Sequence, residues 1–195
     1  SLSDGEVRDK VKVLFEKHTA IYLSVSTIEP RKNHEFQLDA FEQLWADGLN
    51  TCLCIVGRVG WKTDSFMDRV HSHPEFGRRL FVFHDLGDHE LIYCYKRSKT
   101  LLFTSFAEGF GLPLVEASHY QLPVICSDIP VFREVGGESF RYCDLRDVSS
   151  LVALIQQQEL CLQAESAPVR HCLSWRESSA ELLMNLSISI HCENT

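Results

Sequence analysis

Short apolar runs alternate along the chain with stretches whose hydrophobic residues recur at helical spacing. The apolar runs predict strands at Ala20–Ser26, Thr51–Val56, Leu80–Phe83, Thr100–Thr104, Leu122–Cys126 and Ser139–Tyr142. The helical pattern falls at Asn33–Ala46, Asp64–Val70, Asp88–Arg97, Leu112–His119, Val131–Val135, Asp147–Gln158 and Trp175–Leu186. Continuous apolar strands that alternate with helices are typical of parallel strands buried on both faces. The pattern therefore predicts an α/β fold with a Rossmann-like doubly wound parallel sheet.

The length of the chain suits one domain. Its 195 residues, 45% of them hydrophobic, can bury one core but would be cramped as two domains. We expect residues 1–195 to form a single domain, with 1–19 as a linker and first helix and about 173–187 as a C-terminal helix. Glu159–Pro168 is the expected flexible joint before that last helix. Because the chain opens on Ser1 without an initiator methionine, we also expect a domain upstream of it.

Charge and composition exclude several classes of function. The formal net charge of −8 disfavours nucleic acid as a partner, since phosphate backbones are bound by clustered lysine and arginine. No apolar run approaches the roughly 18 residues that span a bilayer, and the N-terminus lacks a signal core. We expect a cytoplasmic protein, with peripheral association at the inner face of the membrane as a further location for the full-length chain. The eight cysteines form no Cys-x-x-Cys pair, so reduced core thiols are expected and no metal site is predicted.

The segment Glu108–Glu116 holds the most informative candidate chemistry. Gly109 and Gly111 can adopt positive φ and let a ligand approach the backbone, and Pro113 suits the first turn of a helix. The N–H groups and dipole of that helix terminus favour phosphate or pyrophosphate, while the two glutamates could accept hydrogen bonds from sugar hydroxyls. Simple loop punctuation with an exposed Glu116 is an equal alternative on this pattern alone. Two helical acids eight residues apart would lie roughly 12 Å apart, which disfavours a glycosidase without excluding it.

Other candidate residues follow neighbouring strands. Ligands of doubly wound sheets bind beyond the carboxyl ends of the strands, and four loops are expected there. Arg31 and Lys32 supply adjacent cations suited to a diphosphate. Gly57 after the second strand leaves room for a close approach of ligand to backbone, although a simple turn explains it equally well. A solvated basic pair is the corresponding alternative for Arg31 and Lys32.

Several motifs in this order resemble a known family. Over about residues 20–186 the chain is similar to the C-terminal donor-binding domain of a glycosyltransferase family 4 enzyme, also called glycosyl transferases group 1, of the GT-B type. The resemblance implies one half of a GT-B fold, with an N-terminal acceptor domain absent from this chain. The matching segments are Ser105–Ala117, Leu122–Asp128, Glu29–Asn33, Val56-Gly57, Arg133–Gly137 and Leu173–Trp175.

The resemblance implies a role for individual residues at the donor. Glu108 would contact the donor sugar near its reacting face, and Glu116 would hold the nucleotide ribose. Lys32 would neutralise the leaving diphosphate, and Leu86 falls where the family holds the base through main-chain contacts. The pyrophosphate would be bound by backbone N–H groups of Phe110, Gly111 and Leu112.

The chain departs from the family pattern at one position. Many members have Gly-Arg where this chain has Ser26-Thr27, so the usual phosphate-binding arginine is missing there. Thr27 remains a candidate donor contact, and Arg31 is the expected substitute for the missing guanidinium. Enzymes of this kind retain the anomeric configuration and use cationic side chains at the diphosphate, so neither a cofactor nor a metal is expected.

The variant Glu-Pro-Arg-Lys-Asn at 29–33 resembles bacterial mannosyltransferases that build O-antigen or other surface polysaccharides. This implies a hexosyltransferase whose donor is GDP-mannose, with a UDP-sugar as the alternative, and whose acceptor is a saccharide or a lipid-linked sugar. We expect the chain to be inactive alone, because acceptor contacts would come from the missing domain. The competing hypotheses are a catalytically degenerate nucleotide-sugar binding module of a larger or tandem enzyme, and a protein similar to nucleotide-sugar epimerases.

Overall fold

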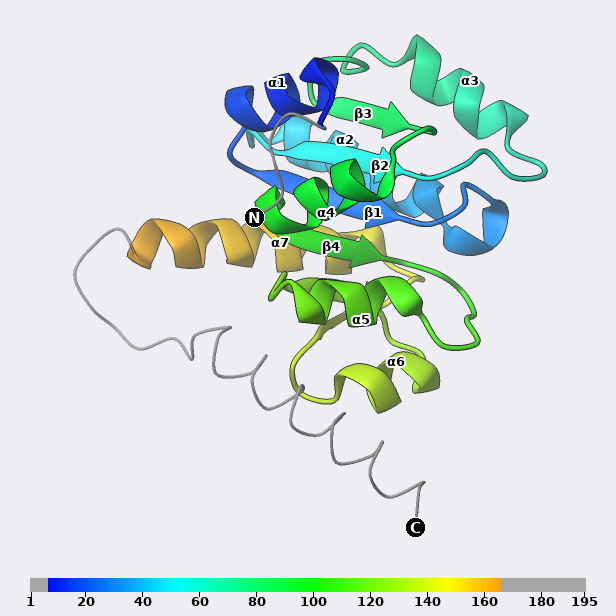
Figure 1. The fold of residues 1–195 in the computed structure, drawn as a ribbon. Coiled ribbons are helices and arrows are strands. Elements are labelled where there is room, and N and C mark those ends of the chain that lie inside the picture. The colour runs from blue at the N-terminus through cyan, green and yellow to red at the C-terminus, as the bar shows by residue number, and fades with distance from the viewer. Residues whose placement is uncertain (1–6, 166–195) are drawn as a thin grey trace.

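The computed structural model describes residues 7–165, which form a six-stranded parallel sheet with helices on both faces (Figure 1). The strand order is β3-β2-β1-β4-β5-β6, which confirms the predicted doubly wound sheet. The strands are β1 (Ile21–Val25), β2 (Cys52–Val56), β3 (Leu80–Phe83), β4 (Thr100–Phe103), β5 (Val124–Ser127) and β6 (Arg141–Cys143).

The helices divide between the two faces of the sheet (Figure 1). One hydrophobic cluster contains side chains of α1 (Asp9–Lys17), α4 (Asp88–Arg97), α5 (Leu112–His119) and α6 (Pro130–Gly136). The other cluster contains side chains of α2 (His34–Ala46), α3 (Asp64–Ser72) and α7 (Val148–Glu165). We call these the α4 face and the α2 face of the sheet.

Successive side chains of each strand point to opposite faces of the sheet, so one strand contributes to both hydrophobic clusters. In β1, Ile21 and Leu23 pack into the α4-face cluster, while Tyr22 between them packs into the α2-face cluster. Cys54 and Ile55 of β2 divide in the same way. Strands buried on both sides have no polar face, which is why they read in the sequence as unbroken apolar runs.

The observed elements differ from the predicted ones mainly at the C-terminal end. Helix α7 continues to Glu165, so the flexible joint predicted from Glu159 is wrong over that stretch. The region from 159 to 165 contains good helix formers and no glycine or proline. Glu159 is also anchored, because it accepts hydrogen bonds from Tyr22 (2.6 Å) and Lys99 (2.6 Å). The helix predicted for about residues 173–187 lies outside the described residues.

The cysteines whose side chains the structure describes behave as predicted. Cys52, Cys54, Cys94, Cys126 and Cys143 are free thiols and all are buried. Burial raises the pKa of the Cys94 thiol to about 12. These side chains therefore serve as small core residues.

Candidate functional site

The candidate site lies where the strand order reverses. Strands β1 and β4 are neighbours, and the chain proceeds outward from them in opposite directions across the sheet. Ligands of open α/β sheets bind in the crevice at this point, beyond the carboxyl ends of the strands. Glu108 belongs to the loop after β4, and Arg31 and Lys32 belong to the loop after β1. The topology therefore brings these three predicted residues to one place.

The loop after β1 is fixed on both sides by its neighbours. Toward β2, the backbone N–H of Ile28 donates to the carbonyl of Arg58 (2.8 Å) and that of Gly60 donates to Ile28 (2.8 Å). Toward β4, the N–H of Phe106 donates to the carbonyl of Arg31 (2.9 Å). These bonds hold the three loops at the edge as one unit.

Gly57 takes part in this arrangement through its lack of a side chain. A Cβ at this position would lie 1.8 Å from the backbone oxygen of Ser26. The glycine is therefore needed for the close approach of the loops after β1 and β2. The sequence predicted a close approach to a ligand, whereas the neighbour in the structure is the protein's own backbone.

A short turn orients the two cations. Residues Pro30–Lys32 form a 3-10 turn before α2, and Asn33 at the start of the helix has φ 57°. Asn33 occupies the N-cap position, but its side chain makes no capping hydrogen bond. In this turn both Arg31 and Lys32 reach the carboxylate of Glu108.

Glu108 is the centre of a charged cluster. Its Oε1 accepts hydrogen bonds from Lys32 Nζ and from the Ser105 hydroxyl (2.7 Å). Its Oε2 accepts one from Arg31 Nη1, at 2.9 Å. The Glu108 and Lys32 side chains are only 9% and 11% exposed, whereas Arg31 is 43% exposed. The buried pair is therefore Lys32–Glu108, and Arg31 covers it from the solvent side.

The cluster keeps Glu108 ionised. Burial acts to raise the pKa of this carboxyl, but hydrogen bonds from Lys32, Ser105 and Arg31 outweigh it and hold the pKa below its ordinary value. The ε-ammonium of Lys32 also lies 5.3 Å from the centre of the Phe103 ring. The cluster therefore places two cations, Arg31 and Lys32, and one anion, Glu108, where a ligand at the switch point could contact them.

The loop between Glu108 and α5 has the backbone form expected of an anion site. Gly111 adopts φ 85° and is the N-cap residue of α5, with Pro113 in the first turn. Of the two glycines that could adopt positive φ, Gly109 does not, and a Cβ there would meet no atom within 4 Å. The first turn of any helix leaves N–H groups without intrahelical partners, so the start of α5 can offer them to an anion.

The second predicted acid, Glu116, stands apart from the cluster. It lies on α5, is exposed, and accepts a hydrogen bond from the buried Tyr95 hydroxyl at 2.6 Å. Burial, reinforced by the Glu116 carboxylate, raises the pKa of Tyr95 above its ordinary range. Tyr95 thus holds one carboxylate oxygen of Glu116, a residue that is exposed as a whole.

Comparison with known proteins identifies the family. The sequence profile of glycosyl transferases group 1 matches residues 6–161, which is well over half of the chain. The chain belongs to this family. The resemblance stated from the motifs is therefore confirmed at the level of the family.

Curated relatives of this group 1 glycosyltransferase domain are longer proteins. The chain is 40% identical over 171 residues to the serotype-specific mannosyltransferase WbdA of Escherichia coli, a match that covers 86% of the chain and 21% of WbdA. It is 35% identical over 156 residues to the O-antigen chain mannosyltransferase B of Escherichia coli, covering 80% of the chain and 38% of that protein. The chain therefore spans about a fifth of the length of WbdA.

A solved structure supports the same fold. The chain superposes on Anabaena HepE, determined in complex with UDP and glucose, with a TM-score of 0.63 and 16% sequence identity. The match covers 91% of this chain and 52% of HepE. The domain thus has the α/β architecture of one half of a GT-B glycosyltransferase.

The structure brings only part of the predicted set of site residues into contact. Glu108, Lys32 and Arg31 form one cluster, whereas Glu116 is held separately by Tyr95. Leu86 is half-buried against the α4-face cluster, and Thr27 is exposed beside Gly60. The donor-binding roles of all these residues stay predictions.

Sequence reasoning missed several partners that shape the site. Ser105 and Tyr95 orient the two acids, and Glu29 binds the far side of the Arg31 guanidinium at 2.8 Å. Ser105 immediately follows a predicted strand, which could have marked it as an edge residue. Tyr95 gave no such signal, because a tyrosine on an amphipathic helix reads as an ordinary core residue.

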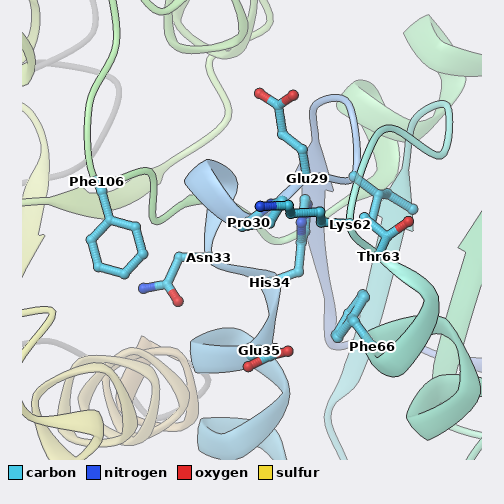
Figure 2. Close-up of a pocket in the computed structure, with 10 residues that line it drawn as sticks. Glu29, Pro30, Asn33, His34, Glu35, Lys62, Thr63, Phe66 and Phe106 are labelled. Atoms are coloured by element: carbon cyan, nitrogen blue, oxygen red, sulfur yellow. The ribbon is translucent and has the colours of Figure 1, made fainter.

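A pocket of about 270 Å³ opens on the α2 face next to the charged cluster. It is lined by the loop after β1, the first residues of α2 and the start of α3, with the Phe106 ring across from them (Figure 2). No motif in the sequence pointed to it. Between residues 7 and 165, no three histidine, cysteine, aspartate or glutamate side chains gather as a metal site, and no helix is both long and apolar enough to cross a membrane.

Proposed function

We propose that this chain is the donor-binding domain of a retaining mannosyltransferase that takes mannose from GDP-mannose. The acceptor would be a saccharide or lipid-linked sugar in surface polysaccharide synthesis. The observation that carries the proposal is the meeting of Lys32 and Glu108 at the switch point, next to the N-terminus of α5. Both relatives described above are named mannosyltransferases, which supports mannose as the sugar.

The pyrophosphate of the donor fits the start of α5. Backbone N–H groups of Phe110, Gly111 and Leu112 would bind it, and the positive end of the helix would favour its charge. Lys32 and Arg31 then stabilise the negative charge that builds up on GDP as the bond to the sugar breaks. Cations already placed at that position need little reorganisation when the charge develops.

Glu116 and Glu108 would bind the two remaining parts of the donor, the ribose and the mannose. Glu116 would accept hydrogen bonds from the ribose with the oxygen that Tyr95 does not bind. Glu108 would accept hydrogen bonds from mannose hydroxyls beside its reacting face. For this, Lys32 must turn from Glu108 toward the diphosphate, so donor binding exchanges one ion pair for another. No metal is part of this proposal, since the two cations take its place.

Calorimetric titration of the 195-residue chain tests the proposal. We expect GDP and GDP-mannose to bind with dissociation constants in the micromolar to millimolar range and UDP to bind more weakly. Lys32→Ala should weaken GDP binding by about tenfold, the effect of losing one charge-assisted contact. Failure of every nucleotide and nucleotide sugar to bind would reject the donor-binding function, and a preference for UDP would reject GDP-mannose.

A catalytically degenerate binding module is the second candidate. The observation in its favour is Ser26-Thr27, which replaces the Gly-Arg pair of many family members. Arg31 takes the place of that arginine in our proposal. Mutating Arg31 and Lys32 separately in the full-length protein distinguishes the two candidates. Unchanged donor binding and turnover in Arg31→Ala would remove that role, and absence of transfer in the unmutated full-length protein would favour degeneracy.

A further inference from the structure

The pocket on the α2 face shares a loop with the charged cluster. Arg31 and Lys32 both bind the Glu108 carboxylate. Their neighbours in the same loop line the pocket, namely Glu29, Pro30 and Asn33 (Figure 2). Phe106, two residues before Glu108, forms the opposite wall. A ligand in this pocket would therefore lie on the other side of one short loop from the Glu108 carboxylate.

The pocket combines apolar walls with free polar groups. Phe106 is 56% exposed and supplies apolar surface, whereas Ile28 and Phe66 line the pocket but are only 1% and 5% exposed. Around them lie the side-chain amide of Asn33 and the carboxylate of Glu35. The described part of the chain supplies no hydrogen-bond partner for either side chain. Their unused capacity is available to a ligand, and a mostly apolar pocket with a few such groups is typical of small-molecule sites.

This lining suits a single sugar ring. A pyranose presents C–H bonds on its faces, which pack on aromatic rings, and hydroxyl groups around its rim, which bind carboxylates and amides. The volume of about 270 Å³ falls just below the roughly 300–1,000 Å³ of pockets for drug-sized ligands. One ring fits that space, whereas a whole nucleotide sugar does not.

One residue of the pocket lining, His34, carries a buried polar atom without a partner. His34 is 3% exposed, and its Nε2 lies 3.1 Å from the Ser26 hydroxyl, but its Nδ1 has no hydrogen-bond partner. Burial, with a smaller effect of Lys32, lowers the pKa of His34 to about 4, so the ring is neutral at pH 7. A buried group without a hydrogen-bond partner costs stability, and a ligand hydroxyl that reached this nitrogen would recover it.

In the proposed function, the nucleotide end of the donor lies on the opposite side of the sheet. Leu86 and the Tyr95–Glu116 pair, expected beside the base and ribose, pack against the α4-face helices. The pocket lies among residues of α2 and α3, on the α2 face. The charged cluster stands between them at the edge, so the pocket continues the site past its sugar end.

We propose that this pocket binds one sugar ring of the saccharide acceptor. Both the acceptor role of this ring and the choice of mannose rest on the proposed function, whereas the presence of a monosaccharide site does not. Such a site would place part of the acceptor chain on the donor domain itself, next to the loop that carries Lys32. It would align the acceptor before transfer.

NMR titration of the ¹⁵N-labelled 195-residue chain with methyl α-mannoside and an α-linked mannobiose tests this inference. We expect saturable shifts in Asn33, Glu35, Lys62 and Phe106, with dissociation constants in the millimolar range. Glu35→Gln and Phe106→Ala should each weaken binding by at least about fivefold, because each removes a main contact of a small ligand. Both side chains are exposed, so both variants should fold.

Matched controls and a GDP titration separate the possible outcomes. Glu16→Gln on α1 and Phe76→Ala, an exposed aromatic outside the pocket, should bind the sugars as the unmutated chain does. Pocket variants should keep their affinity for GDP. Sugar binding in the pocket without any GDP binding would support this inference and reject the proposed function. Absence of sugar binding, shifts confined to residues 108–116, or GDP shifts centred on the pocket would overturn it.

Discussion

At the scale of single residues, the charged groups of the candidate site pair with one another. Glu108 pairs with the two cations that a diphosphate would need. A buried carboxylate left without partners costs several kcal/mol, so in the absence of a ligand this pairing stabilises the edge. In the proposed function the same pairing would oppose the ligand, because Lys32 would have to leave Glu108 to reach a phosphate.

Removing the charge of Glu108 should therefore strengthen nucleotide binding. Glu108→Gln keeps the size of the side chain and its capacity to accept a hydrogen bond from Ser105, but it no longer neutralises Lys32 and Arg31. We expect GDP to bind about threefold or more tightly, with the gain shrinking as salt screens the cations. Calorimetry at two salt concentrations measures this, with Glu16→Gln as the control. A lower affinity for GDP in Glu108→Gln would show that the carboxylate itself supports the nucleotide.

Gly57 and Gly109 provide a contrast between two glycines of the same edge. A Cβ at Gly57 would lie 1.8 Å from the Ser26 oxygen, whereas one at Gly109 would meet nothing within 4 Å. Gly57→Ala should lower the free energy of unfolding by at least about 2 kcal/mol, because backbone atoms must move to relieve the overlap. Gly109→Ala should change it by less than about 0.5 kcal/mol. Urea unfolding of both variants measures the difference, and equal stability would contradict the close approach of the two loops.

At the scale of elements, the sequence predicted the middles of strands and helices better than their ends. Both faces of β1 and β2 are buried, so their apolar runs carry a clear signal. The end of α7 was missed, because Glu159 reads as a polar surface residue. Its partner Tyr22 lies 137 positions away in the sequence, and only the folded chain brings the two together.

The same limit applies to the candidate site. Motifs placed Glu108 and Lys32 on neighbouring loops, because the topology of parallel sheets dictates which loops share an edge. They did not predict that the two side chains pair directly, nor that Tyr95 orients Glu116. Those contacts depend on rotamers and on packing across elements, which leave no local pattern in the sequence.

The attachment of α1 to α4 should depend on pH. The Arg8 guanidinium, just before α1, binds Glu90 of α4 at 2.6 Å and lowers the pKa of that carboxyl from 4.5 to about 2. Because the folded pKa is the lower one, the stabilisation is complete above pH 4.5 and is lost as the pH falls toward 2. Because solvent reaches the Arg8 side of the pair, we expect the gain in stability to be smaller than the full pKa shift would give.

Glu90→Gln tests this attachment. The variant should be less stable than the unmutated chain at pH 7, and the difference should narrow steadily between pH 4.5 and pH 2. Urea unfolding across that range measures it, with Glu16→Gln on the exposed side of α1 as the control. A stability difference that stays constant with pH would mean that the ion pair contributes nothing and that the variant acts through packing.

At the scale of the whole molecule, exposed apolar side chains gather near the candidate site. Val59, Trp61, Phe106, Phe110 and Leu112 all lie in the loops after β2 and β4 or at the start of α5. Apolar surface concentrated on one edge is typical of a surface that meets another molecule or domain. The described part of the chain leaves this edge open to water, so the candidate donor site has no cover.

An uncovered site should bind its donor without transferring the sugar. Leu112 is 65% exposed, Phe110 53% and the Arg31 side chain 43%, so water reaches the place where the diphosphate would lie. Transfer needs a site from which water is excluded, because solvent weakens the stabilisation of the leaving group and competes with the acceptor. Incubating the 195-residue chain with GDP-mannose and an α-linked mannobiose should therefore release no GDP above a protein-free blank, although calorimetry detects GDP binding to the same sample. Addition of the remainder of the full-length protein should restore transfer, with Glu108→Gln as the inactive control. Sustained formation of a mannotriose by the chain alone would show that the open edge is already a complete active site.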